Sequence, residues 1–112
     1  MITDSKNNFW FVASLLFKSV HTPTPSDDPL WEERLILIQA ATQDEANAKA
    51  AIIGAQEVHS YKTVVGDTAT WMFDGVLNTY EIEGSELSDG TELFSRFLRD
   101  TEVSSLKTPF AD

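Results

Sequence analysis

The sequence predicts an α+β fold in the order β-β-α-β-β-α, with a four-stranded antiparallel sheet and both helices packed on one face. Three observations predict it. An aromatic and β-branched stretch lies near the start of the chain, at Phe9–Val20. A helical pattern rich in alanine follows at Thr42–Gln56, and two further β-like stretches come after it. Hairpins on either side of a single helix lead to an antiparallel sheet.

The stretch Phe9–Val20 predicts a central strand. Its alternate residues from Phe9 to Phe17 are all apolar, which gives one continuous apolar side. The other side is mixed and carries Ser14 and Lys18. We therefore expect strong burial on one face of this strand.

A loop is predicted at His21–Pro29, because three of the four prolines of the chain fall there. It is long for a hairpin connection and also holds the adjacent carboxylates of Asp27 and Asp28. Binding residues often lie on long loops above a rigid sheet, so the loop is a candidate site, although a variable hairpin connection is the more ordinary explanation. The second strand is expected at Leu30–Ala41.

The helix is predicted from Thr42 to about Gln56. Thr42 and Glu45 have the spacing of a capping box, in which each side chain satisfies a free amide at the start of the helix. The residues that follow at helical spacing are mostly alanines, so the helix is expected to lie close to the sheet.

Two more strands are predicted at Val58–Val65 and Ala69–Ile82, with a turn at Gly66-Asp67 between them. Gly75 lies inside the last strand, which indicates a bulge or a close approach of backbones. No internal repeat or low-complexity segment occurs.

A short second helix is predicted after the acidic stretch that ends at Glu92. Asp89 and Glu92 have capping spacing, and apolar pairs follow at Leu93/Phe94 and Phe97/Leu98. The chain after Asp100 is expected to be loose. We expect one domain over residues 1–112, with a core at about 9–98 and a polar N-terminus.

The charge limits the classes of partner. The 112 residues hold 18 acidic and 8 basic side chains, for a net charge of −10. Such a chain repels nucleic acids and anionic membrane surfaces, and it attracts basic proteins, although solubility alone can explain the acidity. The chain has no cysteine, which excludes disulfides, thiolate zinc sites and cysteine nucleophiles. Cytoplasmic localisation is expected.

Known catalytic and metal-binding patterns are missing from the sequence. The two histidines, His21 and His59, have no metal-ligand spacing, and His59 and Ser60 are neighbours whose side chains point to opposite faces of a strand. The acidic residues from Glu81 to Glu92 are spaced too irregularly for a calcium loop. The sequence therefore predicts no cofactor, no metal and no catalytic residue, and it leans away from an enzyme.

The sequence resembles a family of small bacterial proteins known as domain of unknown function 4288. The resemblance covers roughly Phe9 to Leu98. Its motifs are Trp10-Phe11-Val12-Ala13, Glu33 with Leu35–Ala40, Glu45-Ala46, Tyr61-Lys62, Gly66, Trp71-x-Phe73-x-Gly75-Val76 and Asp89-Gly90-Thr91-Glu92-Leu93. Thr63 stands where the resemblance implies an asparagine. The family has no established activity, so the resemblance implies a fold and no chemistry.

Two hypotheses about function remain open. The first is a non-enzymatic protein-interaction domain, immunity- or antitoxin-like in one version, that binds a basic partner or forms a homodimer. The homodimer would use the exposed face of the sheet, which is expected to carry aromatic residues from Trp10, Trp31 or Trp71. The second is a small-molecule-binding or minor enzymatic domain with a cleft lined by aromatic residues of the strands, beside Lys62 and Glu33; the aromatic residues are Trp10, Tyr61, Trp71 and Phe73. The candidate binding residues for the two together are Asp27, Asp28, Trp31, Glu33, Tyr61, Lys62 and Trp71.

Overall fold

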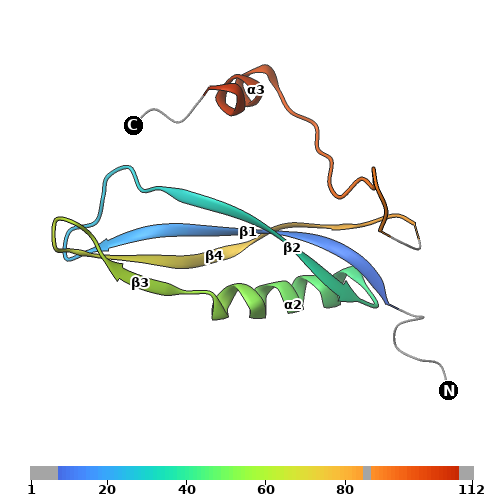
Figure 1. Cartoon of the computed structure of the whole chain (residues 1–112), viewed down its shortest axis with the longest axis horizontal. Coiled ribbons are helices and arrows are strands. Elements are labelled where there is room, and N and C mark those ends of the chain that lie inside the picture. The colour runs from blue at the N-terminus through green and yellow to red at the C-terminus, as the bar shows by residue number, and fades with distance from the viewer. Residues whose placement is uncertain (1–7, 85–86, 109–112) are drawn as a thin grey trace.

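The computed structural model describes residues 8–84 and 87–108; the polar N-terminus at 1–7 and the end of the chain at 109–112 lie outside them. The elements are β1 (Phe9–Thr22), β2 (Trp31–Ala40), α2 (Gln43–Gln56), β3 (His59–Lys62), β4 (Thr68–Glu81) and α3 (Asp100–Lys107). The strands form one antiparallel sheet in the order β2-β1-β4-β3 (Figure 1). The fold is α+β.

The first strand, β1, lies at the centre of the sheet between β2 and β4. The alternation in its sequence predicted strong burial of one face, and this is confirmed for Phe11, Ala13, Leu15 and Phe17, which are all core residues. Phe9 at the start of the strand is 47% exposed, and on the other face Val12 and Ser14 are buried as well. The strand continues two residues past the predicted end at Val20, because its last residues pair with the start of β4.

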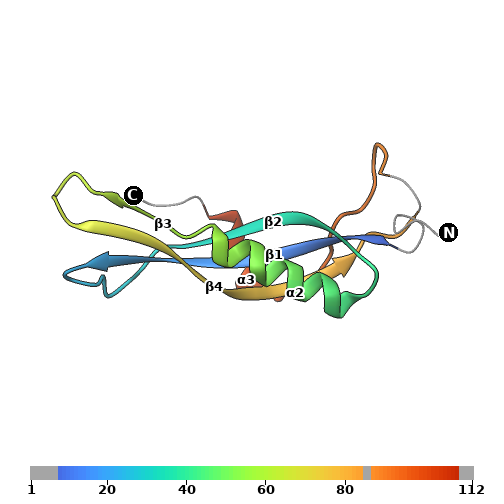
Figure 2. The same cartoon turned by 90° about the horizontal axis from the view of Figure 1, so that it is seen from below.

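Helix α2 covers one face of the sheet (Figure 2). The Thr42 hydroxyl accepts a hydrogen bond from the Glu45 amide at 3.1 Å, as the capping pattern predicted. Ala46, Ala50 and Gly54 are the buried residues of the helix. Their small size brings the helix close to the strands, since no long side chain separates the two layers.

Strand β4 contains two β-bulges on either side of Gly75, where the sequence predicted an irregularity. Its register with β1 shifts between Ser14 and Leu15 and again between Leu16 and Phe17. Each extra residue reverses the alternation of the strand. Two bulges together restore it, so that both Val76 and Phe73 pack against the core beneath α2.

Strand β3 is shorter than the predicted Val58–Val65, because a tight turn begins directly after Lys62. The Gly66 amide donates to the Thr63 carbonyl at 3.1 Å, and the Thr63 amide donates to the Asp67 carbonyl at 2.9 Å. Gly66 has a φ of 95°, a conformation that favours glycine.

The second helix lies later in the chain than predicted. Residues 91–99 have no regular structure, and α3 occupies the region expected to be loose. The Arg99 amide at its start donates to the Glu102 carboxylate at 2.7 Å. Asp89 and Glu92 do not begin a helix, because Thr91 closes a turn with Ser88 instead.

The prediction that both helices cover one face is not confirmed. Figures 1 and 2 place α3 on the side of the sheet away from α2. Within the described chain, α3 buries none of its own residues. One face of the sheet is therefore covered by a helix and the other is not. No helix among the described residues is long and apolar enough to cross a membrane.

Candidate functional site

The face of the sheet away from α2 carries a group of exposed apolar side chains. The register of β1 with β2 and β4 defines this face, since residues that alternate with the core residues point to it. We call it the open face. Its exposed apolar members are Trp10, Trp31, Leu35, Leu37 and Met72, and it also carries Val12, Ser14, Leu16, Lys18, Glu33 and Tyr80.

The most exposed part of the open face lies on the edge strand β2. Trp31, Leu35 and Leu37 keep 46%, 52% and 49% of their surface accessible. Together with Glu33, they occupy every alternate position from Trp31 to Leu37, so the four side chains form one row on the same face, with Leu35 and Leu37 adjacent in it. Scattered single leucines on a surface need no explanation, but a contiguous apolar row on one face is typical of a binding surface.

Polar contacts within the open face give it a defined charge pattern. The Ser14 hydroxyl, which is almost fully buried, donates to the Glu33 carboxylate. The Lys18 ammonium lies 5.5 Å from the centre of the Trp31 ring. The lysine is thus engaged with an aromatic ring, while the carboxylate of Glu33 stays at the surface between apolar neighbours.

The C-terminal part of the chain covers the β4 side of the open face. The Phe94 ring meets the Tyr80 ring edge-on, with centroids 4.9 Å apart and planes at 87°. The Arg96 guanidinium lies 5.6 Å from the Phe94 ring. Tyr80, Ser95, Arg96 and Phe97 line a hollow of about 600 Å³ beside this contact. The exposed row on β2 lies two strands away from this contact on β4, because β1 runs between the two strands.

The loops at residues 23–30 and 63–67 lie together at one end of the sheet (Figures 1 and 2). The Asp67 carboxylate accepts from the Thr63 hydroxyl and lies 3.1 Å from the His21 ring, so it links the turn to the end of β1. Val64 and Val65 are exposed at the tip of the turn. These valines do not contribute to the core.

Hydrogen bonds from Thr63 and His21 lower the pKa of Asp67 below its ordinary value of 3.8. A carboxyl group whose pKa is lower in the folded protein stabilises it when ionised, and this contribution is lost as the pH falls through the folded pKa. We expect Asp67→Asn to be less stable than the wild type at neutral pH, with the difference shrinking below about pH 4. Urea unfolding of both proteins from pH 7 to pH 2.5 measures this difference in the free energy of unfolding. A difference independent of pH would contradict an ionic role.

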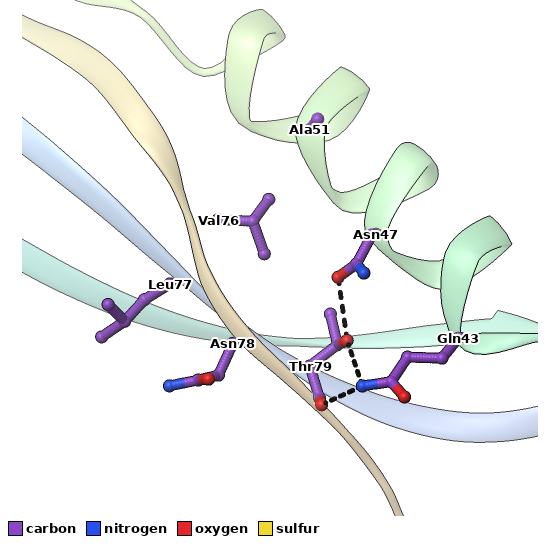
Figure 3. Close-up of a pocket in the computed structure, with 7 residues that line it drawn as sticks. All are labelled: Gln43, Asn47, Ala51, Val76, Leu77, Asn78 and Thr79. Carbon is purple, nitrogen blue, oxygen red and sulfur yellow. Dashed lines mark hydrogen bonds between the residues drawn. The ribbon is translucent and has the colours of Figure 1, made fainter.

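A groove between α2 and β4 is polar (Figure 3). The Gln43 amide donates to the carbonyl and hydroxyl of Thr79 at 3.0 and 3.2 Å, and the Thr79 hydroxyl donates to Asn47 at 2.8 Å. The groove has a volume of about 520 Å³ and is also lined by Ala51, Val76, Leu77 and Asn78. Because these polar groups already satisfy one another, they fasten the helix to the sheet. Sequence analysis missed them, although the spacing of Gln43 and Asn47 places both on one side of the helix.

The predicted binding residues do not form one site. Trp31 and Glu33 lie together on the open face, whereas Tyr61 and Trp71 share the face that carries α2. Lys62 points to the side opposite Tyr61. Trp71 packs against the core rather than lying on the aromatic exposed face where the sequence placed it.

Asp27 and Asp28 are exposed in the loop before β2, apart from the other predicted residues. His21 contacts Asp67, and the His59 ring lies 3.4 Å from the Glu57 carbonyl in an exposed position. Across residues 8–84 and 87–108, no three side chains of the metal-binding types come together.

The fold and the open face define an α+β domain with a two-layer core, one helix against a four-stranded antiparallel sheet, and an apolar surface on the other side. The chain belongs to the family described as Domain of unknown function (DUF4288), whose model matches residues 10–95. This confirms the family identified from the sequence. No curated protein sequence and no solved structure matches the chain.

Proposed function

We propose that this chain is a non-catalytic protein-interaction domain that binds a basic protein through its open face. The observation that carries the proposal is the exposed row of Trp31, Leu35 and Leu37 on β2. Aromatic and leucine side chains at the centre of such a surface supply binding energy when a partner removes them from water. Each of them already lies on a rigid strand, so little ordering is needed on binding.

The charge of the chain supports a basic partner. With a net charge of −10, the protein attracts basic surfaces over several ångströms and speeds their encounter. Glu33 sits inside the apolar row, and Asp27 and Asp28 precede it in the neighbouring loop. A partner with Arg or Lys beside an apolar anchor would complement this arrangement. An immunity- or antitoxin-like role is one version of such binding.

The placement of the other candidate residues favours binding over catalysis. A cleft lined by Trp10, Trp71 and Tyr61 would require these aromatic residues on one side of the sheet. Trp10 lies on the open face, while Trp71 and Tyr61 lie on the opposite face. The arrangement therefore gives the small-molecule hypothesis less support than the protein-binding hypothesis.

The test is affinity capture from an extract of the native host, followed by titration of the purified partner. The double variant Leu35→Ser/Leu37→Ser removes two apolar anchors and should weaken binding at least about tenfold, which corresponds to about 1.4 kcal/mol. Ile52→Ser is the matched control, because Ile52 is 59% exposed on α2, away from the open face. Its affinity should equal that of the wild type.

Two results would overturn the proposal. One is a captured partner whose affinity is the same for the Leu35→Ser/Leu37→Ser variant and the wild type, provided that both proteins are folded by circular dichroism. The other is turnover of a small metabolite by the purified chain, abolished by changes outside the open face.

A further inference from the structure

The segment Phe94–Arg99 is basic and aromatic in an otherwise acidic protein. It contains two of the three arginines of the chain, two phenylalanines and no carboxylate. Together with α3, it forms an extension of the fold at residues 94–107, which we call the C-terminal arm.

The arm is anchored at its base and exposed beyond it. Phe94 is held against Tyr80 by the edge-on ring contact described above. Phe97, three residues later, is fully exposed, and Leu106 in α3 is largely exposed. An apolar side chain that stays in water contributes no burial energy to its own fold. These two side chains are therefore available to bind a surface on another molecule.

The charges of the segment Phe94–Arg99 complement those of the open face. Within the described residues, neither Arg96 nor Arg99 forms an ion pair, whereas Arg34 pairs with Glu32 at 2.7 Å. On the open face, the Glu33 carboxylate is at the surface beside Leu35. The arginines of this segment can therefore pair with the glutamate of the row, and its phenylalanines can pack against the leucines.

We propose that two copies of the chain exchange their C-terminal arms, so that Phe97 of each copy packs on Leu35 and Leu37 of the other. Arg96 or Arg99 then lies near Glu33 of the second copy. The exchange is symmetric, because each chain supplies one arm and one open face. This inference rests on the proposed function of the open face, and it names a second copy as the occupant when no other partner is bound.

The first test is the mass of the full chain by sedimentation velocity across a hundredfold range of concentration. The wild type should be a dimer at the upper end. Phe97→Ser removes an exposed side chain, so the fold is retained, and the dimer should dissociate at concentrations at least about tenfold higher than for the wild type. Ile52→Ser should dimerise like the wild type. A monomeric wild type, or an unchanged Phe97→Ser dimer, would overturn the proposal.

The absence of cysteine in the chain allows a second test that separates exchange from a fold-back within one chain. One variant carries Leu37→Cys and another carries Phe97→Cys. After mild oxidation of the mixture, exchange predicts a disulfide between the two different variants. The pair Ile52→Cys and Phe97→Cys should give far less of this product. A third variant carries both Leu37→Cys and Phe97→Cys in one chain. If only this double variant forms the bond, and does so within a monomer, the arm covers its own open face and exchange is wrong.

These results are distinguishable from a failure of the proposed function. A monomeric wild type that still binds a basic partner through Leu35 and Leu37 rejects exchange and keeps the protein-binding proposal. The opposite result is a dimer that depends on Phe97 and a partner affinity that is unchanged by Leu35→Ser/Leu37→Ser. It supports arm exchange and contradicts the proposal that the partner binds to the open face.

Discussion

Phe17→Ala is expected to destabilise the protein by about 3–5 kcal/mol, because it removes the largest fully buried side chain in the described part of the chain and leaves a cavity. The Phe17 ring lies 5.6 Å from the Phe73 ring, measured between centroids. The Arg34 guanidinium also lies 4.1 Å from the centre of the Phe17 ring and is held by Glu32. Aromatic and cationic contacts are therefore lost together with the buried area.

Urea unfolding followed by tryptophan fluorescence measures this loss. Phe17→Leu keeps part of the apolar volume and should be intermediate between Phe17→Ala and the wild type. Ile52→Ala, on the exposed side of α2, should stay within about 0.5 kcal/mol of the wild type. Equal stability of Phe17→Ala and Ile52→Ala would mean that Phe17 is not in the core.

Gly54→Ala is expected to cost roughly 1–3 kcal/mol, although alanine favours a helix by about 1 kcal/mol over glycine. The reason is the contact between α2 and β4. A Cβ atom on Gly54 would lie 2.6 Å from Cδ1 and 2.7 Å from Cζ of the Phe73 ring, far inside van der Waals contact. Either the ring or the helix must move.

A double-mutant cycle tests whether this clash is the cause. Phe73→Leu is smaller at the point of contact, so Gly54→Ala should cost less in a Phe73→Leu background than in the wild type. Thermal unfolding of the four proteins gives the coupling energy. If Gly54→Ala stabilises the wild type, as helix propensity alone predicts, the close approach of helix and ring is wrong.

The sequence predicted local features of the fold well. Two features are encoded within a few residues and are confirmed: the core positions of β1 from Phe11 to Phe17, and the capping hydrogen bond from the Glu45 amide to the Thr42 hydroxyl. The irregularity at Gly75 was also predicted, because glycine inside a strand has few other uses. Each of these features depends on residues that are close together in the sequence.

Features that depend on distant residues were predicted poorly. The bulges of β4 place Val76 and Phe73 three residues apart on the same face, so no simple alternation is visible in its sequence. Trp71 was expected on the exposed face. The bulges in β4 instead turn its side chain to the face that carries α2. The second helix was placed too early for two reasons. A local turn between Ser88 and Thr91 replaces the capping arrangement expected at Asp89 and Glu92. The contact of Phe94 with Tyr80 is tertiary and holds the following segment outside a helix.

The candidate site was predicted in part. Trp31 and Glu33 do lie side by side on the open face, since both belong to one strand with the same parity. Leu35 and Leu37 were overlooked, because a strand rich in leucine and isoleucine does not show which of its faces is covered. Their exposure follows from the position of α2 on the other face.

The central position of β1 has a consequence for the growing polypeptide. β1 is synthesised before the other strands of the sheet. One of its neighbours, β2, follows it directly in the chain, whereas the other, β4, is synthesised only after α2 and β3. Until Thr68–Glu81 has left the ribosome, one edge of the most apolar strand stays unpaired. The nascent chain therefore passes through a stage with an open edge, and a chain that ends before Thr68 remains at that stage permanently.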